Sequence, residues 1–329
     1  MAHHHHHHGD GESHGHTHGV VDATIATTSR GIWAIKWSFV GLAITAVLQI
    51  FIVALTDSVS LLADTIHNIG DAMTAVPLWI AFLFARRVAS RRFNYGFGRV
   101  EDLAGAVIVL VIAFSAAVAG YQSIERLINP REIHYVGAVA AGGAIGFLGN
   151  EAVALFRIRI GREINSAALI ADGQHARIDG LTSLAVLVGA VAVWAGFPLA
   201  DPIAGIIITA VIVKIVVDSA KSVFGRMLDG VDPEVLDQIE HLASHVAGAD
   251  VPTRARARWI GHRLQIEVRI DIAAEQSVGD ARDLEDRVAE EIRDHISYAG
   301  EILVIARPLD AENGREPRPA RTADADRHE

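Results

Sequence analysis

The sequence predicts an α-helical membrane protein with six transmembrane helices followed by a small α+β cytoplasmic domain. Hydrophobic residues make up 51% of the 329 residues, and the mean hydropathy is +0.30. That composition is too apolar for an ordinary soluble protein of this length. Apolar segments of spanning length also recur along the first two thirds of the chain, whereas the last third has the periodicities of a soluble unit.

Six apolar segments reach the roughly 20 residues that are needed to cross a hydrocarbon core of about 30 Å. They cover residues 31–55, 58–85, 100–128, 134–156, 164–195 and 199–224. Arginines gather at the second and fourth connections: Arg86, Arg87, Arg91, Arg92 and Arg99, then Arg157, Arg159 and Arg162. Because basic residues favour the cytoplasmic side, both termini are expected in the cytoplasm.

The expected C-terminal domain has the element order αββαβ, with helices on one face of a sheet. Helical and alternating apolar patterns predict these elements. They are a helix at 233–247, strands at 254–260 and 264–270, a helix through 284–292 and a strand at 302–305.

Composition divides the chain into four parts: a disordered His-rich tail (1–29), the transmembrane domain (30–228), the αββαβ domain (229–309) and a disordered tail (310–329). The histidine run at 3–8 has the pattern of a purification tag. The later histidines at 14, 16 and 18 favour a native metal-collecting tail.

Composition also limits the partners. The chain has no cysteine, so disulfides are excluded and a metal site must use His, Asp, Glu, Asn or backbone oxygen. The net charge of −10, without one basic face, argues against a nucleic-acid partner. No secretory signal peptide is visible at the polar, His-rich N-terminus.

Two of the expected spans carry the same pattern of ionisable residues, Asp-x-x-His-x-x-x-Asp. The residues are Asp64, His67 and Asp71 in the second span and Asp172, His175 and Asp179 in the fifth. On a helix these positions form one stripe, and each His lies one turn from the following Asp. Two such helices supply four ligands, the number that tetrahedral zinc prefers.

The alternative interpretation is that these polar side chains bond to one another and fix helix packing. Charges in a bilayer core are costly and are functional by default, which favours the metal site. The expected ligands are His67, Asp71, His175 and Asp179. Asp64 and Asp172 are candidates for orienting the histidines, relaying protons or lining a vestibule. From the expected helix ends, His175 lies about 17 Å into its span, near the midplane.

On these features the chain resembles the cation diffusion facilitator family over residues 31–307. Further marks are the stretch from Tyr95 to Glu101, similar to the family's Tyr-Gly-x-x-Arg-x-Glu, and Asp201-Pro202. The resemblance implies a homodimeric metal/proton antiporter whose transport site maps onto the two His and two Asp ligands. That ligand set resembles the zinc and cadmium branch, whereas all-carboxylate variants are associated with manganese or iron.

The chain also departs from the family. Phe97 stands where some members have a metal-binding His. Glu267 and Ala306 or Arg307 stand where others place cytoplasmic His ligands. Those additional sites are therefore in doubt. The remaining candidates for a metal at a dimer contact are His241, His245, His262 and His295, for which ordinary surface positions are the simpler account.

The expected function is proton-coupled efflux of divalent metal ions from the cytoplasm by alternating access, with zinc first and cadmium or cobalt as other candidates. No prosthetic group is expected. The expected location is a bacterial plasma membrane. A membrane metal sensor that binds zinc without transporting it is the alternative. An intramembrane metalloprotease is disfavoured because no His-Glu-x-x-His occurs, so no enzyme activity is expected.

Three further charged positions need partners or roles. Arg177 points away from the ligand stripe, and its candidate partner Glu151 fits poorly in estimated depth. Lys214 and Asp218, one turn apart, are expected to form a snorkelling pair. The acidic pair at 101–102 opens the third span, where it suits the helix dipole, with gating as the minority interpretation.

Overall fold

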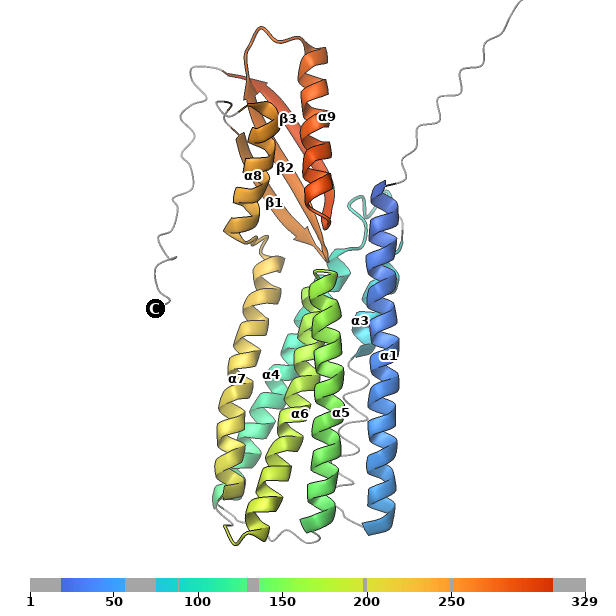
Figure 1. The fold of residues 1–329 in the computed structure, drawn as a ribbon, viewed down its shortest axis with the longest axis vertical. Helices are drawn as coiled ribbons and strands as arrows, with labels where there is room; N and C mark the ends of the chain where they lie inside the picture. The colour runs from blue at the N-terminus through green and yellow to red at the C-terminus, as the bar shows by residue number, and fades with distance from the viewer. Residues whose placement is uncertain are drawn as a thin grey trace, which may run out of the picture.

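The structure is a computed structural model that describes residues 19–56, 75–87, 89–128, 136–197, 200–248, 251 and 253–309. It is elongated, with a helical bundle at one end and an α/β unit at the other (Figure 1). The described bundle helices are α1 Gly19–Thr56, α3 Ala75–Ala85, α4 Arg99–Ile128, α5 Val136–Glu163, α6 Ala167–Trp194 and α7 Ala200–Met227.

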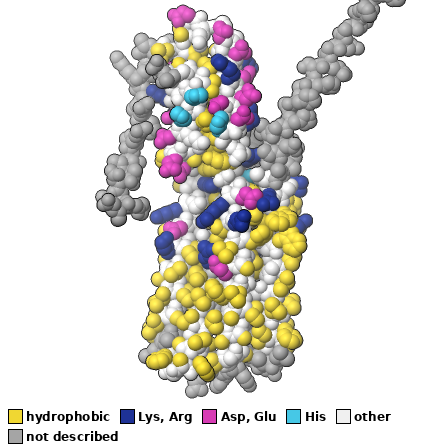
Figure 2. Space-filling model, in the orientation of Figure 1, with side chains coloured by type: hydrophobic (Ala, Val, Ile, Leu, Met, Phe, Trp, Pro, Cys, Tyr) yellow, Lys and Arg dark blue, Asp and Glu magenta, His cyan; other side chains and the backbone are white. Residues whose placement is uncertain are grey.

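Five of the described helices are long and apolar enough to cross a membrane: α1, α4, α5, α6 and α7. The shorter apolar helix α3 coincides with the C-terminal end of the expected 58–85 span, and residues 57–74 lie outside the described residues. On the face that Figure 2 shows, hydrophobic side chains cover the bundle, and charged side chains begin where it meets the α/β unit. The predicted fold class is confirmed.

Two helices, α1 and α5, extend by seven or more residues beyond their expected ends. Helix α1 begins at Gly19, so residues 19–29 are helical rather than part of a disordered tail, and residues 1–18 lie outside the description. No Gly or Pro interrupts the chain from Val20 to Arg30, which lets the helix continue. Helix α5 runs to Glu163 rather than to 156, because Ile158, Ile160 and Gly161 are buried along it.

Helices α5 and α6 form a tight antiparallel hairpin. Residues 164–166 join them, with Asn165 at a positive φ of 57° and the Ser166 side chain accepting a hydrogen bond from the backbone N–H of Leu169. Glycines line the contact. A Cβ at Gly143 would lie 2.9 Å from the Ser183 carbonyl oxygen, and one at Gly173 would lie 3.0 Å from the backbone nitrogen of residue 158. The helices approach closely because these side chains are absent.

The C-terminal unit contains α8 Pro233–Ala247, β1 Thr253–Ile260, β2 Arg263–Ile272, α9 Val278–His295 and β3 Ala299–Pro308. Strand β2 is central, antiparallel to β1 and parallel to β3. Alternate β2 residues, Leu264 to Ile270, are fully buried against Leu284, Val288 and Ile292 of α9. The predicted order αββαβ is therefore confirmed, with both helices on one face of the sheet (Figure 1).

The glycine contact predicts a position-specific effect of added methyl groups. Gly143→Ala should destabilise the bundle by about 1–3 kcal/mol, because the new Cβ would overlap the α6 backbone. Gly137→Ala, on the same helix but with nothing within 4 Å of the added Cβ, is the matched control. Thermal unfolding of the purified protein, followed by tryptophan fluorescence, measures both. Equal midpoints for the two variants would contradict the close contact.

Candidate metal site and its surroundings

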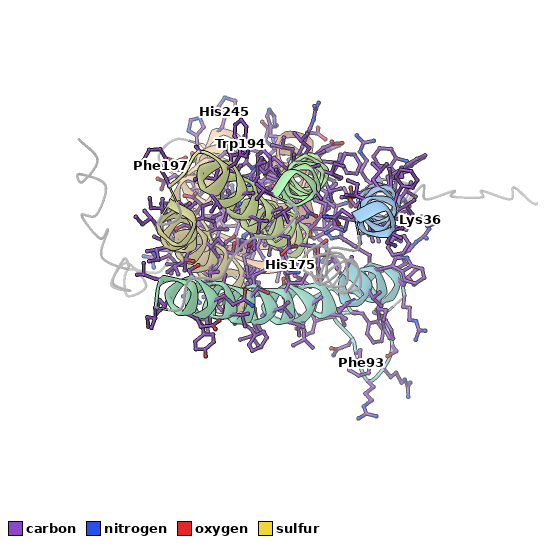
Figure 3. The ribbon with its side chains drawn as sticks, turned by 90° about the horizontal axis from the view of Figure 1, so that it is seen from below. Lys36, Phe93, His175, Trp194, Phe197 and His245 are labelled. Carbon is purple, nitrogen blue, oxygen red and sulfur yellow. The ribbon has the colours of Figure 1, made fainter. Side chains whose placement is uncertain are left out.

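Two of the four expected metal ligands lie on α6 and are buried inside the bundle. His175 is 1% exposed and Asp179 is 5% exposed, and they are one helical turn apart. The imidazole Nε2 lies 3.9 Å from the carboxylate Oδ2. Viewed along the bundle, His175 lies among the helices, whereas Lys36, Trp194 and Phe197 lie at the periphery (Figure 3).

The separation of these two atoms is compatible with a shared metal ion. Zinc–nitrogen and zinc–oxygen bonds of about 2.0–2.2 Å at a tetrahedral angle place the two donor atoms roughly 3.4 Å apart. The observed 3.9 Å is about 0.5 Å longer. A small rotation of either side chain closes that difference.

The position of His175 along its helix differs from the expected one. Helix α6 starts at Ala167, so His175 is about 12 Å from that end rather than about 17 Å, and Asp179 is about 18 Å from it. In a helix of 28 residues, about 42 Å long, Asp179 is the ligand closer to the middle. The other expected ligands, His67 and Asp71, lie outside the described residues, as does Asp64.

A buried ion pair lies next to this ligand stripe. Arg157 of α5, 1% exposed, places Nη1 3.0 Å from Oδ2 of the fully buried Asp172. The Nε and Nη2 atoms of this arginine, and Oδ1 of the aspartate, make no hydrogen bond with any described residue. Arg157 was expected at a loop, but the longer α5 carries it into the bundle. Its charge balances the carboxylate one turn from His175.

Arg177 has a partner. Its Nε and Nη2 donate to the two oxygens of Glu151 on α5 at 3.2 and 2.9 Å. The depth mismatch arose from the expected end of the fourth span. With α5 ending at Glu163, Glu151 lies about 18 Å from the connection to α6, and Arg177 lies about 15 Å from it. The pair is therefore level.

Lys214 and Asp218 of α7 form the expected exposed pair, with Nζ donating to Oδ2 at 2.7 Å. The two residues lie one turn apart on the surface of the same helix. It needs no partner from another helix.

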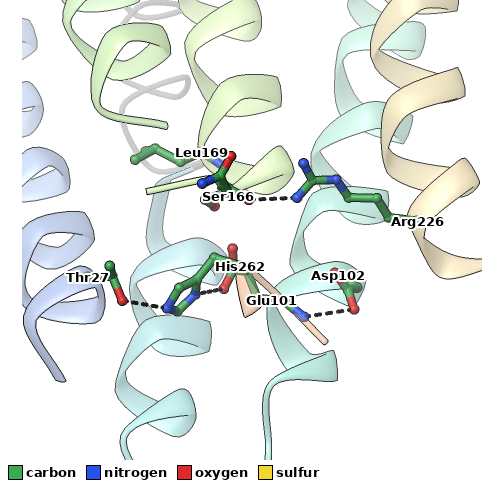
Figure 4. Close-up of polar contacts among 9 residues, drawn as sticks. Thr27, Glu101, Asp102, Ser166, Leu169, Arg226 and His262 are labelled. Atoms are coloured by element: carbon green, nitrogen blue, oxygen red, sulfur yellow. Dashed lines mark hydrogen bonds and ion pairs between the residues drawn. The ribbon is translucent and has the colours of Figure 1, made fainter. Parts of the chain in front are cut away.

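A second polar cluster joins the bundle to the C-terminal unit (Figure 4). His262, in the turn between β1 and β2, is 3% exposed. Its Nδ1 lies 2.7 Å from Oε2 of Glu101 on α4, and its Nε2 lies 3.0 Å from Oγ1 of Thr27 on α1. Both ring nitrogens are thus engaged within the chain, so His262 is buried between the bundle and the C-terminal unit rather than exposed at the surface. We call this contact of Thr27, Glu101 and His262 the joint.

The turn that carries His262 fits closely against the start of α4. Gly261 has a positive φ of 61°, and a Cβ there would lie 2.8 Å from Oε2 of Glu101. Its backbone N–H donates to Asp102 at 3.3 Å. On the α7 side, the Arg226 guanidinium lies 4.0 Å from the ring centre of Trp259 on β1 and donates to the Asn165 carbonyl. The acidic residues of α4 therefore bind the β1–β2 turn, beyond any interaction with the helix dipole.

The other histidines of the C-terminal unit are on its surface. His241 and His245 are exposed on α8, and His295 is exposed at the end of α9, where its Nδ1 lies 2.9 Å from the Glu291 carbonyl oxygen. Glu267 of β2 lies opposite Arg256 of β1. Within the described part of the chain, no three His, Asp or Glu side chains converge as a metal site would require. Two of the four expected transport ligands are outside that part.

Sequence reasoning missed Arg157 and the His262–Glu101 contact. Arg157 sits beside two other arginines, which gave the segment the composition of a loop. Glu101 and His262 are 161 positions apart, so no local pattern relates them. Gly261 followed by His262, between two predicted strands, was a sequence signal for a two-residue turn. It gave no indication of what that turn would contact.

A known family matches the helical bundle of this chain. The sequence profile described as the cation efflux transmembrane domain matches residues 35–228. A probable cation efflux system protein of Mycobacterium tuberculosis is 54% identical over 252 residues, which cover 77% of this chain and 76% of the relative. The magnetosome protein MamB of Magnetospirillum gryphiswaldense is 27% identical over 258 residues (78% and 87%). The manganese efflux system protein MneP of Bacillus subtilis is 22% identical over 268 residues (79% and 90%).

Apolar helices of spanning length that enclose an imidazole and carboxylates are typical of a multi-pass membrane transporter of cations. The chain belongs to the cation efflux family, the cation diffusion facilitators. It is a transporter of divalent metal cations rather than an enzyme. The metal ion is its substrate, and the family uses no prosthetic group.

The buried Arg157–Asp172 pair predicts a double-mutant pattern. Arg157→Leu should lower the free energy of unfolding by about 3–5 kcal/mol, because it leaves a buried carboxylate without its cation. Adding Asp172→Leu should restore much of that loss. Arg159→Leu, on the exposed side of the same helix, is the control. Unfolding in detergent, followed by circular dichroism, measures these three variants, Asp172→Leu alone and the unaltered protein. Additive losses in the double variant would argue against a direct pair.

The joint at His262 predicts a loss of stability that an exposed histidine does not give. His262→Ala should cost about 1–3 kcal/mol, because Glu101 and Thr27 lose their buried partner. His241→Ala on the surface of α8 should leave the unfolding midpoint unchanged. Limited proteolysis of the α7–α8 connection gives a second readout, with faster cleavage expected for His262→Ala. Identical midpoints and cleavage rates in the two variants would refute the joint.

Proposed function

We propose that this transporter exports zinc in exchange for protons, through a site formed by His67, Asp71, His175 and Asp179. The observation that carries the proposal is the position of His175 and Asp179. They are buried within the bundle, one turn apart on α6, with donor atoms 3.9 Å apart. A membrane-buried imidazole facing a carboxylate is a site for a divalent ion in a protein that moves such ions.

Donor chemistry supports zinc as the substrate. Two imidazoles and two carboxylates suit a borderline ion that accepts tetrahedral nitrogen and oxygen ligands. Magnesium, calcium and manganese prefer carboxylate, carbonyl and water oxygens. One relative is named for manganese efflux, but at 22% identity its substrate does not transfer to this chain. Cadmium and cobalt remain competitors because they accept the same donors.

Proton coupling follows from the same ligands. Zinc requires neutral imidazole and ionised carboxylate, so metal binding releases protons and protonation releases metal. Alternating access around such a site exchanges the two ions. We place the C-terminal unit and both termini on the cytoplasmic side of a plasma membrane. In that orientation, an inward proton gradient would drive metal out of the cytoplasm. We also propose that the chain works as a homodimer.

Zinc flux in proteoliposomes tests the site. Zinc uptake driven by a pH gradient should fall at least ten-fold in His175→Ala and in Asp179→Ala, because each loses a ligand that contributes more than about 1.4 kcal/mol to binding. His245→Ala, an exposed histidine on α8, is the control that should retain full flux. Cadmium, cobalt and manganese are measured in competition with zinc.

The site assignment, the proton coupling and the choice of zinc each have their own contradicting result. Unchanged zinc flux in both α6 variants would remove the site assignment. Equal flux with and without the pH gradient, in the unaltered protein, would remove proton coupling. Stronger competition by manganese than by cadmium would overturn zinc as the substrate.

A further inference from the structure

We propose that the loop between α3 and α4 is a binding site for the headgroups of anionic phospholipids. The site consists of Arg87, Arg91, Arg92, Phe93 and Tyr95. These residues have no part in the transport site. The loop lies at the end of the bundle that faces the C-terminal unit (Figure 1).

The charged side chains of this loop are all positive. Residues 86–98 contain four arginines, at 86, 87, 91 and 92, and no Asp or Glu. All four are exposed. Among the described residues, none of the four lies within ion-pair distance of a carboxylate, in contrast to Arg99, which pairs with Asp102 and Asp229. The chain as a whole carries a charge of −10, so this cationic loop is a local exception.

Aromatic rings accompany the arginines. The Arg87 guanidinium lies 4.4 Å from the ring centre of Phe84, and that of Arg92 lies 5.8 Å from Phe93. Phe93 is 48% exposed and Tyr95 is 65% exposed. Arginine stacked on an exposed ring is an arrangement suited to the membrane interface, where rings sit at headgroup level and cations meet phosphates.

The loop has a defined shape. The backbone of Ser90 donates to the Phe93 carbonyl, and the Phe93 N–H donates to the Ser90 hydroxyl. These bonds close a turn with Arg91 and Arg92 at its tip. In the view along the bundle, the loop carries Phe93 sideways, away from the helices (Figure 3). A lateral projection at the end of a spanning helix places the tip along the bilayer surface rather than out in solvent.

A cavity lies between this loop and the β1–β2 turn. Its volume is about 460 Å³, and its lining includes Arg87, Tyr95 and Arg263. One carboxylate, Glu301, also lines it, and Gln265 donates to that group at 2.9 Å. The pocket is open to solvent and its volume is within the range of small-molecule sites, so a headgroup fits there, with Arg91, Arg92 and Phe93 in the adjoining tip of the loop rather than in the lining. The occupant that fits the charge and the position is therefore a lipid from the surrounding bilayer.

Lipid retention by the full-length protein tests the proposal. The protein is purified in detergent, incubated with an equimolar mixture of phosphatidylglycerol and phosphatidylcholine, and examined by native mass spectrometry. Phosphatidylglycerol should be retained preferentially. Arg91→Gln with Arg92→Gln should weaken that retention about 30-fold, the factor expected for two basic side chains at a membrane surface.

The matched control removes the same charge elsewhere. Arg282→Gln with Arg293→Gln, both exposed on α9, should leave retention unchanged. Phe93→Ser should weaken retention without changing charge. Inorganic phosphate at matched ionic strength should not displace the lipid. Equal retention of the two lipids, an unaffected tip variant, an equal loss in the control pair, or displacement by free phosphate would each overturn the proposal.

Discussion

The close contact between α5 and α6 is the constraint on which the arrangement of the bundle depends. A three-residue connection makes the helices antiparallel, and glycines let their backbones approach. Two ion pairs on the same helices, Arg157–Asp172 and Glu151–Arg177, have nearly constant sums of residue numbers, 329 and 328. In an antiparallel helix pair, residues at the same level have a constant sum, so both ion pairs indicate the same register of α6 along α5. Sliding α6 along α5 would separate both pairs at once, so His175 is held at a fixed level.

The charges within the bundle have different environments and therefore different consequences. The Arg157–Asp172 pair is almost inaccessible, so its partners depend on one another. The Glu151–Arg177 pair is about one quarter exposed and lies at the margin of the same helices. Neither cation lies on the stripe of His175 and Asp179. The proposed α6 ligands, His175 and Asp179, are thus flanked by charges that are already paired.

How much of the molecule the sequence could predict depends on whether a feature is local. The spans and the αββαβ order follow from periodicity, which adjacent residues specify. The buried face of α6 also follows, because its polar stripe repeats every turn. The candidate partner of Arg177, Glu151, seemed to fit poorly in depth because the expected fourth span ends seven residues early, and an arginine-rich helix end looks like a loop. The contact between Glu101 and His262 is purely tertiary. His67 and Asp71 remain predictions.

The joint of Thr27, Glu101 and His262 brings together three segments that are synthesised at very different times. The first two are present when about a third of the chain has been made, whereas His262 follows only after every described bundle helix is complete. During synthesis, the contacts of Thr27 and Glu101 with His262 can therefore form only after the β1–β2 turn has been made. Such a contact closes a loop of more than 160 residues, which costs more chain entropy than a local contact does. Its formation therefore marks a chain in which every described bundle helix has already been made.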